Sequence, residues 1–374
     1  MPLNDNSTRK SNVSAGAPRF LIDKGRPIQN IGTTHPLLRL LLGDEKIVGD
    51  ERLGKLLRFK NVLKPKGEKM EANHQGKIIA DRPLTRATSF DVTVKSDPNT
   101  IFANTFPYAR RIQTWNIPGI DMDRLGADGY FDPIDGYMNA ADQGMFDSFA
   151  GFLFGNSLAT VTNVAGLNSL ISDGQGTGTI NGTNYGTTFD ESPFKLYGDY
   201  DRSQADNTAL RGIVVRGVGG TTGFGGMTKQ KFRTVQAMTR RNGGRNDVFV
   251  ANDLVVAGWN ETFQEQASTF ESPYDELLQE TGSTYIKYAG TIILGDPGCD
   301  PGTGYMLDLS TFHLFWDGLA PGSRANTTKV KGDVQVRVDY IPGDEDDYVV
   351  KRIYDSGLYL DDPRKNAKVL GITG

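Results

Sequence analysis

A cluster of glycines lies where a phosphate-binding loop would lie, between a predicted strand and a predicted helix. The cluster reads G-V-G-G-T-T-G-F-G-G over residues 217–226. A dinucleotide-binding loop needs the spacing G-x-G-x-x-G, but Thr222 stands where the third glycine belongs, and no Gly-Lys-Ser/Thr follows for a P-loop. The cluster is therefore predicted to be a hinge between domains. The hinge glycines are Gly217, Gly219, Gly220, Gly223, Gly225 and Gly226.

The histidines and the cysteine are spaced without a catalytic or metal-binding pattern. His35, His74 and His313 form no H-x-x-x-H pair for zinc, and no G-x-S-x-G elbow marks a nucleophile. A Ser/His/Asp triad stays open, because its members can be distant in the chain. Cys299 lies in a Gly/Pro turn and is expected to be an inert thiol. We expect no cofactor, no metal and no enzymatic activity.

Two groups of acidic residues in the C-terminal third could in principle meet a cation. Neither group has the spacing of an EF-hand loop, so both are predicted to be solvated turns. The residues are Asp296, Asp300 and Asp308 in one group, and Asp344, Glu345, Asp346 and Asp347 in the other.

Opposite charges gather in two other segments. Between Lys55 and Arg86 there are nine Lys/Arg and three Asp/Glu, a net charge of 9 − 3 = +6. Residues 121–147 hold seven Asp and one Arg, a net charge of 1 − 7 = −6. Exposed charges of this kind give orientation and register more than affinity. We therefore predict that the basic loop of one subunit lies over the acidic region of a neighbour. The predicted contact residues are Arg58, Lys60, Lys64, Lys66, Lys69, Asp121, Asp123, Asp128, Asp132 and Asp135.

The elements that position these residues alternate between helices and strands. The best helix spans 133–154: Asp132 is a good N-cap, Pro133 occupies the preferred first position, and apolar residues follow at 3–4 spacing. Further helices are predicted at 36–48, 228–241 and 253–266, the last capped by Asn252. Strands are predicted at 90–95, 213–215, 248–251, 284–294 and 305–315, followed by a closing hairpin over 334–354. The pattern indicates an α+β fold.

Composition narrows the class of protein. The 374 residues are 37% hydrophobic and include 45 glycines, which favours many loops, a modest core and further burial between copies. The net charge of 41 − 45 = −4 argues against a general polyphosphate binder. We expect no membrane span and no secretion signal. Residues 1–18 are polar and aperiodic, so neighbouring subunits would have to hold them.

Six segments, taken in order, resemble the major capsid proteins of tailed bacteriophages with the Hong Kong 97-type fold. The run YFDPIDGYMNAADQGMFDSFAGFLFGN is similar to the long spine helix of that family, and NVAGLNSLISDG and SPFKLYGDYDRS follow it. Next come NDVFVANDLVVAGWNETFQEQ, YIKYAGTIILGDPGCDPGTGYMLDLSTFHLFWDG and SGLYLDDPRKNAKVLG, similar to the later strands and helix. The resemblance covers roughly residues 35–374.

The resemblance implies an architecture and a function. It implies an N-terminal arm (1–54), an extended β-loop (55–115), a peripheral domain (116–215 with 325–374) holding the spine helix 133–154, and an axial domain (216–324). It further implies a non-catalytic protein that assembles as hexamers and pentamers into an icosahedral virion capsid around double-stranded DNA, without sequence-specific binding. Assembly is expected in the host cytoplasm, with a separate scaffolding protein, a portal and, in some such shells, a decoration protein.

Two alternatives stay open at this point. One is the shell protein of an encapsulin-type bacterial compartment, which would enclose an enzyme instead of DNA. The other is a soluble α+β enzyme with an unrecognised pair of carboxylates. The size of the purified particle separates the shell readings from the enzyme reading, since it shows either shells or small oligomers.

Overall fold

The computed structural model describes fifteen stretches of the chain, most of them in its C-terminal two thirds. The strand predicted at 90–95 lies outside them. Within these stretches, no helix is both long and apolar enough to cross a membrane. The described residues are 36–42, 69–75, 101–117, 140, 144, 147–160, 163–175, 178–180, 183–185, 190–216, 225–264, 285–317, 328–329, 335–340 and 348–373.

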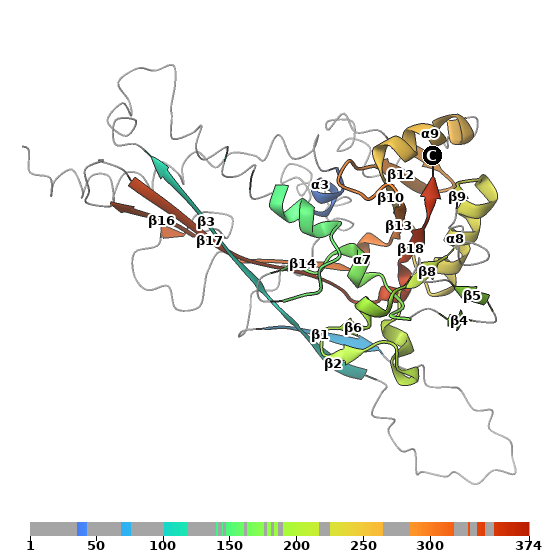
Figure 1. Ribbon diagram of the computed structural model, residues 1–374, viewed down its shortest axis with the longest axis horizontal. Coiled ribbons are helices and arrows are strands. Elements are labelled where there is room, and N and C mark those ends of the chain that lie inside the picture. The colour runs from blue at the N-terminus through green and yellow to red at the C-terminus, as the bar shows by residue number, and fades with distance from the viewer. Residues whose placement is uncertain are drawn as a thin grey trace, which may run out of the picture.

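A mixed six-stranded sheet lies at the centre of the molecule, with strand order β11-β12-β10-β13-β18-β8 (Figure 1). The pairs β10–β12 and β18–β8 are parallel and the other three are antiparallel. Its inner strands read as short apolar runs because both faces are covered. The strands are β8 (Ile213–Val215), β10 (Val248–Ala251), β11 (Tyr285–Tyr288), β12 (Thr291–Gly295), β13 (Thr303–Leu307) and β18 (Ala367–Leu370).

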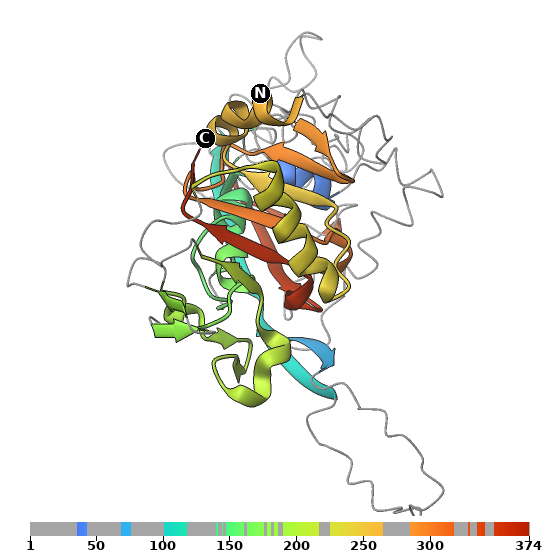
Figure 2. The same cartoon turned by 90° about the vertical axis from the view of Figure 1, so that its right-hand side faces the viewer.

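Helices α8 (Lys229–Arg241) and α9 (Asp253–Gln264) cover one face of this sheet (Figure 2). Helix α8 begins where the Thr228 side chain accepts a hydrogen bond from the amide of Lys231 at 3.2 Å. Its buried residues Phe232 and Val235 join a core with Phe249 and Trp259. This apolar stripe fixes the helix against the sheet.

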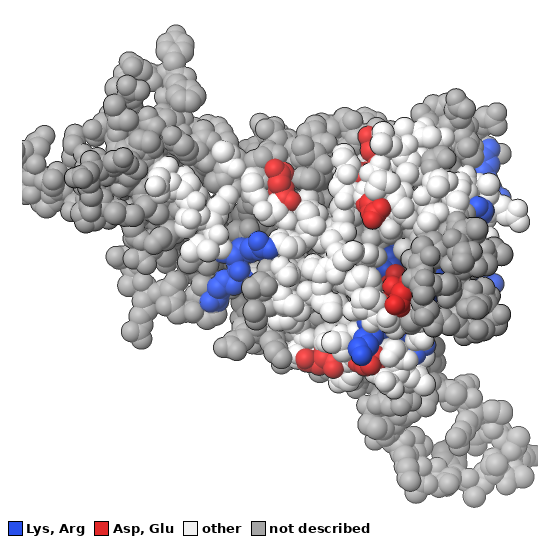
Figure 3. Space-filling view, in the orientation of Figure 1, with Lys and Arg blue, Asp and Glu red and all other residues white. Residues whose placement is uncertain are grey.

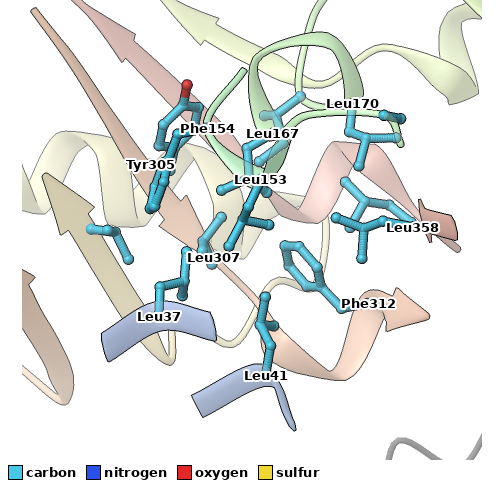
Figure 4. Packing of buried hydrophobic residues seen from close by; sticks show 14 of the residues in the cluster. Leu37, Leu41, Leu153, Phe154, Leu167, Leu170, Tyr305, Leu307, Phe312 and Leu358 are labelled. Carbon is cyan, nitrogen blue, oxygen red and sulfur yellow. The ribbon is translucent and has the colours of Figure 1, made fainter. Parts of the chain in front are cut away.

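The opposite face packs against α3 (Pro36–Leu42), the helical residues 147–153 and the short α7 (Leu167–Leu170). Figure 4 shows Leu37 and Leu41 of α3 pointing toward Leu307 and Phe312. Four leucines of α3 are at most 2% exposed, so this short segment is held by its apolar side chains.

A second sheet forms a long ribbon that leaves the body of the molecule (Figure 1). Its central strand is β17 (Tyr348–Leu360), which pairs along one edge with β14 and then β16, and along the other with β3. All of these pairs are antiparallel. The partner strands are β3 (Ala109–Ile117), β14 (Phe312–Asp317), β15 (Thr328–Lys329) and β16 (Gln335–Tyr340).

Strand β2 (Ile101–Pro107) runs into β3 with only Tyr108 between them, and it pairs antiparallel with β1 (Lys69–Gln75). The remaining strands form two-stranded sheets, and four 3₁₀ turns complete the described part. These elements are β4 (Gly178–Ile180), β5 (Thr183–Tyr185), β6 (Leu196–Tyr197), β7 (Tyr200–Asp201), β9 (Gly225–Gly226), β19 (Ile372–Thr373), η2 (Ser192–Phe194), η3 (Ala205–Leu210), η4 (Leu309–Thr311) and η5 (Pro363–Lys365).

Most predicted elements in the described part are confirmed. The helices predicted at 228–241 and 253–266 are α8 and α9, and the strands at 213–215 and 248–251 are β8 and β10. The closing hairpin is confirmed by β16 and β17, which pair from Tyr340 and Tyr348. Of the helix predicted at 133–154, residues 140, 144 and 147–153 are described and helical, and the helix ends before Gly155.

Two predicted strands were wrong in their extent. The segment 284–294 is a hairpin, β11 and β12, because Ala289 and Gly290 adopt φ of 51° and 82° and form the turn between them. The segment 305–315 is divided between β13 and β14, because the Asp308 side chain accepts from the amide of Ser310 at 3.1 Å and starts η4. Both turns lie within runs of residues that favour strands, so the sequence pattern did not indicate them.

The reading of Asp296 and Asp308 as solvated turns was also wrong. Their exposed fractions are 0% and 1%, and both carboxylates accept backbone hydrogen bonds. Asp300 is exposed, as predicted for a turn.

Strands from both sides of the predicted domain boundaries share the six-stranded sheet. Strand β8 precedes residue 216 and β18 follows residue 325, whereas β13 lies between these boundaries. In the sheet, β18 pairs with β13 on one side and with β8 on the other. The boundaries at 216 and 325 therefore separate strands that one sheet holds together, and the division into domains stays a prediction.

Candidate subunit-contact site

The predicted contact residues lie almost entirely outside the described part of the chain. Lys69 is described and is the first residue of β1. Of the hinge glycines, Gly225 and Gly226 form β9, which pairs in parallel with Ile372 and Thr373. The other predicted residues lie outside the described ranges: Arg58, Lys60, Lys64, Lys66, Asp121, Asp123, Asp128, Asp132, Asp135, Gly217, Gly219, Gly220 and Gly223.

A cluster of polar and aromatic contacts, named here the hairpin anchor, lies where β2 meets the β6–β7 turn. Asn104 of β2 is fully buried there. Its Nδ2 donates to the carbonyl of Tyr197 at 2.8 Å, and its Oδ1 accepts from the amide of Asp199 at 2.9 Å. Thr105 donates a further hydrogen bond to the carboxylate of Asp199. Three polar contacts thus fix the middle of β2 to the β6–β7 turn.

Gly198 is required at this point. It adopts φ of 60°, and a Cβ there would collide with Oδ1 of Asn104. A larger residue would therefore separate the turn from β2, in addition to its unfavourable backbone conformation.

Aromatic rings complete the hairpin anchor. Phe106 stacks on Tyr359 with ring centroids 5.4 Å apart and meets the edge of Tyr197 at 5.1 Å. The ring of His313 also stacks on Tyr359, with ring centroids 4.8 Å apart. The His313 side chain contacts the carboxylate of Asp361. Burial raises the pKa of the Tyr197 hydroxyl, which keeps it protonated as a donor to Leu360. Ring pairs of this kind stabilise the junction beyond the area that they bury.

A buried arginine supports the turn from beneath. The guanidinium of Arg202 donates to the carbonyls of four residues and lies 4.6 Å above the ring of Tyr197. Burial lowers its pKa to about 10, and the group remains charged at neutral pH. The acceptors are Ser169, Leu170, Ser172 and Leu196, at 2.7–3.2 Å.

A cavity of 330 Å³ opens beside the hairpin anchor. Pro107, Leu158, Ala159 and Ala165 contribute to an apolar lining, and Leu196 is 44% exposed. Such a lining suits an apolar side chain better than a charged ligand. Among the described residues, no cluster of three His, Cys, Asp or Glu could hold a metal ion.

Strand β3 presents one covered face and one open face. On the covered face, the guanidinium of Arg111 lies 4.0 Å above the ring of Phe152. On the open face, the exposed residues are Arg110, Ile112, Thr114 and Asn116, and Ile112 is 61% exposed. In Figure 3 a blue spot lies over this ribbon, on a face whose described charges are otherwise scattered. The open face thus offers an apolar residue among polar ones for contact with another molecule.

Cys299 and His313, two of the residues considered for catalysis, are buried. Cys299 is 2% exposed, and burial raises the pKa of its thiol. His313 is occupied by Asp361 and Tyr359. The absence of enzymatic activity stays a prediction.

The hairpin anchor was not predicted from the sequence. Its signal was present in the segment SPFKLYGDYDRS, which contains Tyr197, Gly198, Asp199 and Arg202 and was used only for the resemblance. Asn104 has no sequence signal of its own, because its partners are more than 90 residues away.

No family model matches this chain, and no curated protein matches its sequence. Among solved structures, a chain of the cyanophage A-1(L) capsid is similar with a TM-score of 0.57 at 15% identity, over 83% of this chain and 89% of that chain. This chain has the fold of a phage capsid protein. The resemblance inferred from the sequence is confirmed at the level of the fold, as is its α+β class.

Two further capsid folds are similar at lower scores. The capsid of a native GTA particle has a TM-score of 0.48 at 11% identity, over 83% of this chain and 86% of that chain. The holo-SrpI encapsulin of Synechococcus elongatus PCC 7942 has a TM-score of 0.49 at 11% identity, over 90% of this chain and 95% of that chain. Both scores are below 0.5 and add nothing to the fold assignment.

Proposed function

We propose that this chain is the major capsid protein of a tailed phage, whose copies assemble as hexamers and pentamers into an icosahedral shell around double-stranded DNA. The observation that supports this most is the similarity to the cyanophage capsid chain over 83% of the present chain. The Hong Kong 97-type division into arm, extended loop, peripheral domain and axial domain belongs to the same proposal.

The hairpin anchor supports a role for the β1–β2 hairpin in contact between subunits. Asn104 and Phe106 fix the hairpin to the body through polar and aromatic contacts. A two-stranded hairpin is marginally stable alone, so a stiff anchor and a neighbouring subunit would each contribute to its order. In this arrangement the hairpin transmits the orientation of one subunit to the next.

The basic segment would make the contact. Residues 55–68 precede β1 in the sequence, and Lys69 is its first residue. We propose that this segment lies over the acidic segment 121–147 of the adjacent copy, where opposite charges set orientation and register.

The remaining partners follow from the proposed shell. DNA would be enclosed without sequence-specific contacts, a separate scaffolding protein would guide assembly in the host cytoplasm, and a portal would occupy one vertex. A decoration protein could bind the outer surface of the assembled virion.

Particle size and content test the proposed function. The purified chain is expected to sediment as capsomers or shells and to show rounded particles in negative stain. Particles from the natural source should contain double-stranded DNA, whereas an enclosed enzyme would favour the encapsulin-type alternative. A stable monomer at every protein concentration would contradict both shell readings.

A further inference from the structure

Helix α8 and the turn after it carry basic side chains without acidic ones. Residues 229–245 contain six Lys/Arg and no Asp/Glu. Arg240, Arg241 and Arg245 are exposed, and in the described part of the chain no ion pair joins them to a carboxylate. This end of the helix is therefore a positive surface that the described residues leave uncompensated.

A fourth cation, Lys365, joins this surface because η5 packs against the turn after α8. Nδ2 of Asn242 donates to the carbonyl of Arg364 at 3.0 Å, and a Cβ on Gly243 would lie 3.8 Å from Cε of Lys365. Lys365 also has no acidic partner among the described residues. The four cations are named here the basic end of α8: Arg240, Arg241, Arg245 and Lys365.

Local stability accounts for only part of this cluster. Cations in the last turn of a helix face the negative end of its dipole, which favours Arg240 and Arg241. Arg245 and Lys365 lie beyond the helix, where this effect fades, and like charges brought together repel. Asp247 attracts Arg245 without forming an ion pair with it in the described contacts. An anionic partner would remove the remaining repulsion.

The chain contains a segment of opposite charge in the same region. Residues 261–284, from the last turn of α9 to the residue before β11, hold six Asp/Glu and no Lys/Arg. Residues 265–284 lie outside the described residues and contribute their sequence only. The acidic residues are Glu261, Glu265, Glu271, Asp275, Glu276 and Glu280.

The two charged groups are attached to opposite ends of the six-stranded sheet. Arg245 and Lys365 lie just before β10 and β18 begin, at Val248 and Ala367. The acidic segment returns to the sheet at Tyr285, which pairs with Leu294 beside the other end of β10. Strands β11 and β18 are also four strand spacings apart, about 19 Å. One copy thus presents its positive surface and attaches its negative segment at different sides.

Surfaces placed in this way suit a head-to-tail contact between copies. In such a contact two different surfaces of each copy meet, and its repetition closes a ring when the rotation allows. The hexamers and pentamers of the proposed shell are rings of this kind, so the inference rests on the proposed function.

We propose that the acidic segment 265–284 of one copy binds the basic end of α8 of the next copy in each ring. The guanidinium groups of Arg240 and Arg241 offer paired donors that match carboxylates, and Lys365 adds a point charge. The contact is electrostatic, so salt weakens it.

Zero-length cross-linking with a carbodiimide tests the contact in the wild type, because it joins an amine only to a carboxylate that touches it. Shells are assembled from equal amounts of unlabelled and ¹⁵N-labelled chains, and cross-linked peptides are identified by mass spectrometry. Lys365 should be linked to the acidic segment, and about half of these peptide pairs should combine a light and a heavy chain. Lys195, an exposed lysine before β6, is the internal control and should not be linked to the segment.

The outcomes separate the inference from the proposed function. Pairs that are only light–light or heavy–heavy place the contact within one copy and overturn the inference. Shells that form without the Lys365 cross-link overturn it too and leave the proposed function standing. A wild type that stays monomeric overturns both.

Mixing two charge-reversed chains gives an independent test. Arg240→Glu with Arg241→Glu in one chain, and Asp275→Lys with Glu276→Lys in another, should each weaken assembly by about tenfold at low salt. Circular dichroism checks that both chains fold. An equal mixture should assemble, because every contact in an alternating six-membered ring then pairs opposite charges. A mixture that fails to assemble, or single variants that assemble like the wild type, would contradict the proposed contact.

Discussion

The hydroxyl of Tyr197 and the backbone of Leu360 form two hydrogen bonds, although 163 residues separate them in the sequence. The hydroxyl donates to the carbonyl of Leu360 at 2.6 Å and accepts from its amide at 3.0 Å. The Tyr197 side chain thereby satisfies the backbone amide and carbonyl at the end of β17. The same two bonds orient the ring against which Phe106 packs. Tyr197 therefore couples the hairpin anchor to the end of β17, in addition to the stacking of Phe106 on Tyr359.

Replacing Asn104 by Ala should weaken the hairpin anchor. The change leaves the carbonyl of Tyr197 and the amide of Asp199 without their partner, at a cost of about 2–3 kcal/mol in the free energy of unfolding. Urea unfolding of unassembled subunits measures this loss, and hydrogen exchange should rise in 69–75 and 101–107. Asn116→Ala, at an exposed position of β3, should change stability by less than about 0.5 kcal/mol. Equal losses in the two variants would show that Asn104 has no special role.

Replacing Asp296 by Ala should loosen α3 on the body, where its leucines still hold it. The carboxylate accepts from the buried amide of Leu37 at 3.1 Å and from the amide of Gly298 at 2.9 Å. Losing both acceptors should cost about 2–3 kcal/mol and speed hydrogen exchange over residues 36–42. Asp300→Ala is the matched control, because Asp300 is exposed and bonds only within its own turn in the described contacts. Unchanged protection of α3 in Asp296→Ala would contradict the prediction.

The stability of the subunit should depend on pH through Asp247. Burial, with Asp308 nearby, raises the pKa of Asp247 from 3.8 to about 6. The folded state therefore binds this proton more tightly than the unfolded state, and this contribution to stability falls as pH rises from about 4 to about 6.

Asp247→Asn should remove this decline while keeping an acceptor for the amide of Leu309. At pH 7 the variant should be more stable than the wild type by about 1–2 kcal/mol, since each pKa unit corresponds to about 1.4 kcal/mol and solvent screens part of it. Below pH 4 the two proteins should agree. Thermal unfolding between pH 3.5 and 7.5 measures the difference, with Asp300→Asn as a surface control. If the stability of Asp247→Asn fell with pH as much as that of the wild type, the pH dependence would not come from Asp247.

Charge reversal should test the proposed contact between the basic and acidic segments. The triple change Lys60→Glu, Lys64→Glu and Lys66→Glu should weaken assembly by about tenfold at low salt and by less at high salt, because exposed charges are screened. Adding Asp121→Lys, Asp123→Lys and Asp128→Lys to the same chain should restore assembly. Light scattering at several salt concentrations follows both effects. Assembly that is insensitive to the triple change would show that the segments do not meet.

Elements with local signals could be predicted from the sequence. The periods and caps of α8 and α9, and the alternation of β16 with the start of β17, depend on residues a few positions apart. The order of such segments was also sufficient to indicate the capsid fold, which the cyanophage capsid structure then supported. The turn at Ala289 and Gly290 was missed because alanine rarely adopts a positive φ.

The burial of polar residues and the identity of their partners could not be predicted, because they depend on contacts between distant segments. Asp296 looked like a surface residue until α3 placed the amide of Leu37 against it, 259 residues away in sequence. Lys368 is one of many lysines in the sequence, and its meeting with Asn168 and Glu191 joins positions 200 and 177 residues apart. Burial and partner identity depend on how the sheet, α7 and the β6–β7 turn pack together, and no local pattern records that packing.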